Sequence, residues 1–144
     1  MSSLPRIIAT AFLALMFGLV STGGAQAATP KYGPWTDPVY GLQGRISPAS
    51  AKQAKTYVQV RRISADTTEN IGDRQVRVSY KIGSGKTRTS SIRTLAKGEL
   101  TTFVTAKAAC GARVTITISG RGRASSSQAW SDWQDLTSSF TRSC

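Results

Sequence analysis

Residues 75–82 read QVRVSYKI, and this stretch decides the fold class. Apolar and polar side chains alternate along it without a break, which is the period of a β-strand with two different faces. The apolar face consists of Val76, Val78, Tyr80 and Ile82. The polar face consists of Gln75, Arg77, Ser79 and Lys81. One buried face and one solvated face are typical of antiparallel sheets.

Similar short segments recur on both sides of this strand. Residues 56–63 and 113–119 alternate in the same way, and the glycines of residues 83–85 favour a turn after the central strand. Further strands are expected at residues 87–94, 100–105 and 129–136, with a basic, serine-rich loop at residues 120–127. About six to seven short strands without long helices predict an all-β fold, a small antiparallel β-sandwich.

The segment before these strands is punctuated by prolines and glycines. Residues 28–44 contain Pro30, Pro34 and Pro38, which exclude a helix and favour an extended edge segment. Residues 47–55 begin with a serine and a proline and have good helix propensity, so they form either a turn or two of helix or a loop.

The N-terminus has the three parts of an export signal. Arg6 is followed by the apolar run 7–20 and then by small residues that end in an alanine-x-alanine site before residue 28. The apolar run is shorter than the roughly 20 residues that a spanning helix needs. We therefore expect residues 1–27 to be a cleaved signal peptide. Residues 28–144 are then a single secreted domain without a lipid anchor or a transmembrane segment.

The chain is strongly basic. It carries 19 lysines and arginines against seven aspartates and glutamates, a net charge of +12, and loss of Arg6 with the leader leaves +11. Such a charge favours contact with nucleic acid, anionic lipid or acidic polymers, although it also keeps an exported protein soluble.

The two cysteines, Cys110 and Cys144, both follow the leader. In an oxidising compartment an even number of cysteines predicts a disulfide, and with two the pairing is fixed if the bond is intramolecular. The bond would tie residue 144 to the start of a predicted strand.

The chain contains no histidine. This excludes serine–histidine and cysteine–histidine nucleophile pairs and metal sites that use histidine. A hydrolase would have to use two of the seven carboxylates: Asp37, Asp66, Glu69, Asp73, Glu99, Asp132 and Asp135. The spacing of the acids matches no calcium loop. We expect no catalytic residues, no metal site and no cofactor.

The C-terminal third resembles a known family. A strand at residues 113–120, a glycine- and serine-containing loop and the sequence Trp130-Ser131-Asp132 are similar to the last two strands of fibronectin type III-like modules. The run from Trp130 to Trp133 is also similar to part of the W-S-x-W-S motif of receptor modules in that fold, with Gln134 in place of the second serine. The resemblance implies an immunoglobulin- or fibronectin-like sandwich and says little about a ligand.

Five basic residues cluster in and beside the predicted central hairpin. Arg77 and Lys81 leave the same face of their strand, and Arg61 and Arg62 are positioned to extend this stripe. The candidate anion-binding residues are Arg77, Lys81, Lys86, Arg88 and Arg93. The alternative is that these cations protect sheet edges against aggregation.

The tryptophans are the other candidates for contact. Trp35-Thr36-Asp37 and Trp130-Ser131-Asp132 repeat one pattern near the two ends of the domain, where the first and last strands of a sandwich can lie close together. Trp35, Trp130 and Trp133 therefore form either an aromatic surface for a sugar or peptide, or part of the core. A third option is a ladder in which Arg77 or Arg113 stacks on the rings.

These observations favour a secreted, non-enzymatic module that contacts an anionic surface or polymer through a basic face. The alternative is a protein-interaction module, such as an adhesin, an inhibitor or a secreted toxin, which uses exposed tryptophans or loops. A small carboxylate-based hydrolase is the third hypothesis.

Overall fold

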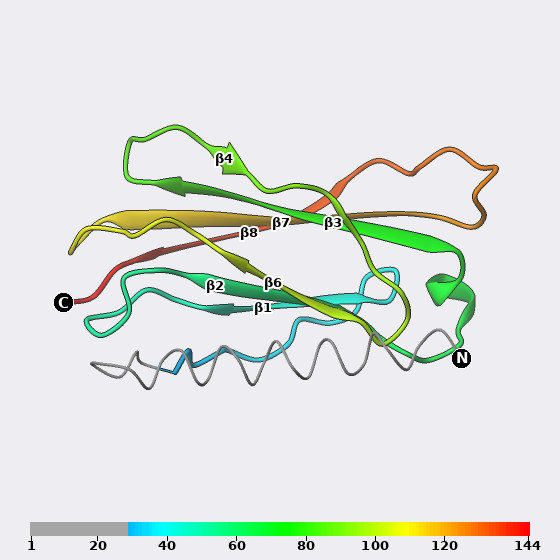
Figure 1. Ribbon diagram of the computed structural model, residues 1–144, viewed down its shortest axis with the longest axis horizontal. Helices are drawn as coiled ribbons and strands as arrows, with labels where there is room; N and C mark the ends of the chain where they lie inside the picture. The colour runs from blue at the N-terminus through cyan, green and yellow to red at the C-terminus, as the bar shows by residue number, and fades with distance from the viewer. Residues whose placement is uncertain (1–28) are drawn as a thin grey trace, which may run out of the picture.

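Two antiparallel sheets face each other in the computed structural model, which describes residues 29–144 (Figure 1). The smaller sheet has the order β1-β2-β6, formed by Leu42–Ser47, Tyr57–Arg62 and Leu100–Val104. The prediction of a small antiparallel β-sandwich is confirmed. The expected signal peptide, residues 1–27, lies outside the described residues.

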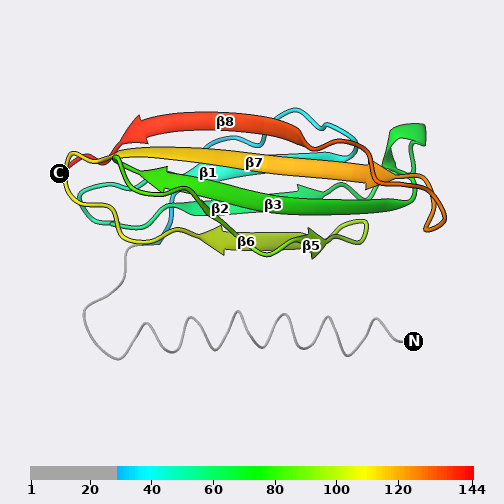
Figure 2. The ribbon, with the colours of Figure 1, turned by 90° about the horizontal axis from the view of Figure 1, so that it is seen from above.

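The larger sheet has five strands. β3 (Asp73–Ile82) pairs with β7 (Arg113–Arg123), which pairs with β8 (Gln134–Thr141). The other edge of β3 holds two very short strands, β4 (Arg88–Thr89) and β5 (Arg93–Thr94), where one polar edge strand was expected. Seen from above, β8, β7 and β3 lie side by side over the smaller sheet (Figure 2).

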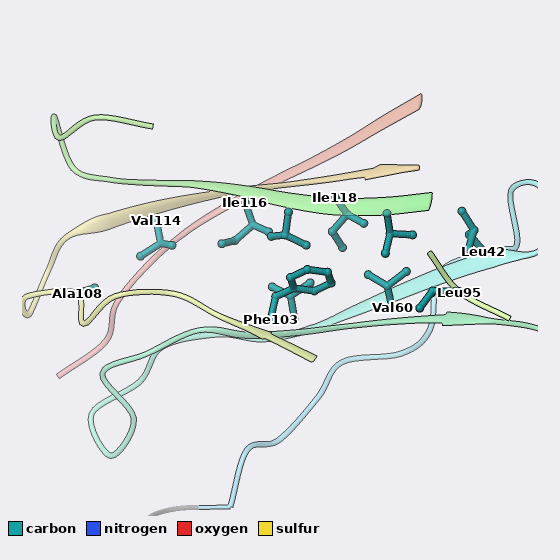
Figure 3. Packing of buried hydrophobic residues seen from close by; sticks show 11 residues of the cluster. Leu42, Val60, Leu95, Phe103, Ala108, Val114, Ile116 and Ile118 are labelled. Carbon is teal, nitrogen blue, oxygen red and sulfur yellow. The ribbon is translucent and has the colours of Figure 1, made fainter. Parts of the chain in front are cut away.

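The core lies between the sheets, as the alternation in residues 75–82 predicts. Val76 and Val78 of β3 are buried, and their partners in register, Gly120 and Ile118 of β7, share the inner face. Figure 3 shows the aliphatic side chains of β7 above Val60 and Phe103 of the smaller sheet. The described residues include one short 3-10 helix, η2 (Thr68–Asn70), and contain no helix long and apolar enough to cross a membrane.

The last strand begins later than predicted. We expected it at residues 129–136, whereas β8 is Gln134–Thr141. We also expected a loop at residues 120–127, but residues 120–123 belong to β7. The reason is that the segment before β8 crosses the outer face of the sheet. There the Ser131 N–H donates to the Gly122 carbonyl at 2.9 Å, and the Ser131 hydroxyl accepts from the Gly122 N–H at 3.1 Å.

The N-terminal region also differs in detail. Leu42–Ser47 forms a regular strand, β1. The sequence analysis predicted only an extended edge segment over residues 28–44. Residues 48–56 form a loop with a turn, so the loop alternative is correct and the helical one is wrong. The Gly33 N–H donates to the Ile46 carbonyl at 2.9 Å, which places the preceding segment along the free edge of β1.

The strand connections gather at the two ends of the sandwich. The Cys110–Cys144 disulfide, with a Cα–Cα distance of 5.7 Å, confirms the predicted pairing and marks one of them. This disulfide end holds residues 48–56, 83–87, 105–112 and 142–144. The opposite end, here called the far end, holds residues 63–72, 95–99 and 124–133.

Candidate functional site

The five predicted anion-binding residues do not lie on a single face. Arg77 and Lys81 point outward from β3, as expected from the alternation. Arg88 pairs in register with Tyr80, and Arg93 pairs with Val76. Because directly paired residues share a face, these two arginines belong to the inner side of the edge. Lys86 is exposed in the turn between β3 and β4.

The structure instead collects exposed cations at the disulfide end. Its four connections contain no aspartate or glutamate, and the Arg142 guanidinium ties two of them together through the Ser50 and Ala108 carbonyls. Six exposed bases lie in these connections or at the adjoining strand ends. We call them the basic end: Lys52, Lys81, Lys86, Arg88, Lys107 and Arg113.

The side-chain carboxylates all lie toward the far end, in its connections or at the strand ends beside them: Asp37, Asp66, Glu69, Asp73, Glu99, Asp132 and Asp135. Within residues 29–144 two ion pairs form, and both are there: Lys97 Nζ lies 2.6 Å from Asp66 and Arg123 Nε lies 2.8 Å from Asp73. The hydrogen bond from Lys97 lowers the pKa of Asp66. The basic end therefore has no ion-pair partner in the described part of the protein.

A ladder of alternating cations and rings crosses the outer face of the larger sheet. In spatial order it is Arg123, Trp130, Arg121, Trp133 and Arg77. The successive distances from guanidinium carbon to ring centroid are 4.2, 5.1, 4.4 and 4.1 Å. Of the two arginines considered for such a ladder, Arg77 stacks on a tryptophan and Arg113 does not. The sequence analysis did not identify the other two cations of the ladder, Arg121 and Arg123.

Neighbouring strands hold these guanidinium groups in place. Arg121 Nε donates to Gln75 Oε1 at 2.9 Å, and Arg123 Nε donates to Asp73 at 2.8 Å. Both acceptors are the direct cross-strand partners of the arginines. Two arginines at positions i and i+2 of a strand, with acceptors at the same spacing opposite, are the sequence signal that would have predicted this arrangement.

A second ladder lies on the outer face of the smaller sheet. Arg45 contacts Tyr32 and Trp35 at 4.6 and 4.3 Å, and Arg61 contacts Trp35 at 4.0 Å. Their Nε atoms donate to the cross-strand amides at Gln59 (2.8 Å) and Gln43 (3.0 Å). Burial raises the pKa of Tyr32, against a smaller opposing effect of the Arg45 charge.

The ladders decide between the interpretations of the tryptophans. All three are half-buried, and none belongs to the core cluster, so the core interpretation is wrong. The repeated pattern does not bring Trp35 beside Trp130, because the two lie on the outer faces of different sheets. Each tryptophan contacts two of the protein's own guanidinium groups, which already occupy much of the ring surface that a sugar or peptide would use.

Arg62 was expected to extend the basic stripe, but it is buried. Its guanidinium donates to Asn70 Oδ1 at 2.8 Å, and to the carbonyls of Leu95, Asn70 and Gly72 at 2.9–3.0 Å. Arg74 is held in the same way, with the Tyr40 carbonyl at 2.7 Å. Burial lowers the pKa of both arginines, and the charge of Arg74 lowers that of Arg62 further. These arginines fasten the far-end connections, and their donors are used by backbone carbonyls and by Asn70.

No known protein family, curated protein sequence or solved structure matches the chain. The resemblance to fibronectin type III-like modules therefore stays a prediction. Within residues 29–144 no three aspartates, glutamates or cysteines lie together in a group that could hold a metal ion.

Proposed function

We propose that this chain is an exported, non-enzymatic module that binds an anionic polymer or surface through its basic end. The observation that carries the proposal is the gathering of six exposed cations at one end of the sandwich, with no aspartate or glutamate in the connections there. The leader sequence and the disulfide support export, because disulfides persist in oxidising compartments.

The clustering of cations at one end matters more for the affinity for a polyanion than the total charge of the protein does. A polyanion that contacts several unpaired cations at once releases its condensed counterions, and this gives affinity that falls steeply with salt. Four of the six cations are lysines, whose flexible ammonium groups suit a repeating polymer better than one rigid anion. The arginines of the ladders contribute less, because their donors and their planar faces are partly used within the protein.

The test compares two variants with the same net charge. In Lys86→Glu/Lys107→Glu two cations of the basic end are reversed, and in Arg93→Glu/Lys97→Glu two exposed cations elsewhere are reversed. Binding of the mature protein to a DNA duplex, a polyphosphate polymer and anionic phospholipid vesicles is measured across a salt series. We expect the first variant to lose at least about tenfold in affinity at 0.15 M salt, and the second less than about threefold.

Equal losses in the two variants would contradict the proposal, because the attraction would then depend on net charge alone. A preference for one polymer at physiological salt would identify the ligand class. A protein partner that is retained at high salt, with no binding to any polyanion, would replace the proposal with the protein-interaction alternative, since apolar anchoring is not screened. Far-UV circular dichroism of both variants controls for folding.

A further inference from the structure

A cavity of about 380 Å³ opens along one side edge of the sandwich, between β4 and β5 of the larger sheet and β6 of the smaller sheet. Figure 1 shows β4 in the upper layer and β6 in the lower one. The edge of the larger sheet consists here of two strands of only two residues each, with residues 90–92 between them. The volume is in the range of small-molecule sites in proteins.

Two arginines reach this cavity from the larger sheet. Arg88 pairs with Tyr80, and Arg93 pairs with Val76. Both partners face the core, and directly paired residues share a face, so the two arginines point to the cavity side of their strands. The Phe103 ring of β6 also lines the cavity, and its centroid lies 5.5 Å from the guanidinium carbon of Arg93, which confirms this direction.

The positive charge at the cavity has no counterpart among the residues around it. No aspartate or glutamate of the described chain lines the cavity, and neither arginine belongs to the two ion pairs of residues 29–144. The hydroxyls of Ser90 and Thr105, which also line it, donate to the carbonyls of the residues that follow them, both at 3.0 Å, so their protons are already used. A guanidinium group has five N–H donors and no acceptor. The cavity therefore presents positive charge and hydrogen-bond donors, which select an oxyanion.

An apolar wall lies between the two cations. The register positions of Arg88 and Arg93 are four residues apart along β3, which corresponds to about 13 Å. Val78 faces inward between these positions, and it lines the cavity together with Phe103 from the opposite sheet. A ligand that contacts both guanidinium groups therefore passes over hydrocarbon surface, and it pairs both cations only if it carries two negative charges.

We propose that this cavity binds a small organic dianion, namely a dicarboxylate or a phosphate monoester. Its oxygens accept hydrogen bonds from Arg88 and Arg93, whose planar donor groups match carboxylate and phosphate oxygens in pairs. Its hydrocarbon part packs against Val78 and Phe103. Arg88 also belongs to the basic end, whereas Arg93 does not, and the inference does not rest on the binding of a polymer.

The test uses ligands that share a six-carbon chain and differ in charge: adipate, hexanoate and hexane-1,6-diammonium. Phenyl phosphate is the second dianion, and comparison with adipate shows which anionic group the cavity prefers. Binding to the mature protein is measured by calorimetry and by amide chemical-shift changes. We expect saturable binding of a dianion, with the largest shifts in residues 78–80, 88–93 and 102–105. Hexanoate should bind at least about fivefold more weakly, and the diammonium ion should not bind.

Arg93→Gln should raise the dissociation constant of the dianion at least about tenfold. The matched control is Lys31→Gln, which also removes one exposed cation but lies outside the cavity and the basic end, and it should change the constant less than about twofold. Because Arg93 is not part of the basic end, Arg93→Gln should keep its binding to polyanions, so that failure of this inference and failure of the proposed function are distinguishable. Circular dichroism of both variants controls for folding.

Three results would overturn the inference. The first is the lack of saturable binding of both adipate and phenyl phosphate in the millimolar range. The second is an affinity for hexanoate equal to that for the dianions. The third is an equal loss of binding in Arg93→Gln and Lys31→Gln, which would show that the attraction depends on net charge alone.

Discussion

Arg121 is the residue on which the larger ladder depends. Its guanidinium contacts both Trp130 and Trp133, and its Nε–H is held by Gln75 on the neighbouring strand. A planar cation can stack on two rings and still donate a hydrogen bond in its own plane, whereas an ammonium group cannot. The sequence predicted that tryptophans and arginines could stack, but it could not predict which arginines, because this follows from the register of β3 and β7.

At this scale we predict that Arg121→Lys lowers the free energy of unfolding by about 1–2 kcal/mol although the charge is kept, because the stacking on two rings is lost. Urea unfolding followed by tryptophan fluorescence measures the change. The matched control is Arg113→Lys, at an exposed arginine outside both ladders, which we expect to leave stability unchanged. Equal effects of the two substitutions would show that stacking contributes nothing.

Among the longer strands, β8 is an edge strand whose side chains are mostly exposed. It pairs with β7 along one side, most of its residues are exposed, and its end is joined to the connection before β7 by the Cys110–Cys144 bond. An edge strand of this kind frays unless its end is fastened. The disulfide therefore stabilises the end of an edge strand that buries few of its side chains.

We predict that Cys110→Ser/Cys144→Ser lowers the free energy of unfolding by roughly 3–4 kcal/mol, as expected for a closed loop of this length. Hydrogen exchange in the native state gives the more specific result: amide protection should fall in β8 before it falls in β3. The reduced wild-type protein serves as a comparison and should behave like the variant. Uniform loss of protection across the larger sheet would argue against a local role in β8.

The elements also divide into those the sequence predicts and those it does not. β3 and the first part of β7 were predicted because one face of each is buried, and burial imposes the period of two. The start of β8 was not predicted correctly. Nearly all residues of β8 are exposed on both faces, so burial does not impose an alternation of apolar and polar residues on this strand. The sequence predicts a strand over residues 129–133, whereas Trp130 and Trp133 precede β8 and stack on arginines.

At the scale of the whole molecule, the composition gives the net charge but not its distribution. The far end holds all seven acids and also several bases: Arg62, Arg74, Lys97, Arg121 and Arg123. The excess of positive charge at the disulfide end follows from which connections the antiparallel register brings together. For the same reason the candidate site was predicted only in part. Lys81, Lys86 and Arg88 belong to the basic end, whereas Arg77 lies in a ladder and Arg93 contacts the Phe103 ring at 5.5 Å.

This distribution predicts opposite effects of two neutralising substitutions. Lys107→Gln should raise the free energy of unfolding at low salt by up to about 0.5 kcal/mol, because it relieves repulsion among unpaired cations. Lys97→Gln should lower stability, because it removes the partner of Asp66. Urea titrations at low and high salt measure both, and the difference should shrink as salt screens the charges. Two changes of the same sign at low salt would contradict this account.

The position of the basic end has a consequence for orientation. A molecule whose excess of positive charge lies toward one end of its long axis experiences a torque near a negatively charged surface, in addition to attraction. It approaches with the disulfide foremost and the far end directed into solution. The chain would therefore stand upright on such a surface, with the outer faces of both sheets left accessible to a third molecule.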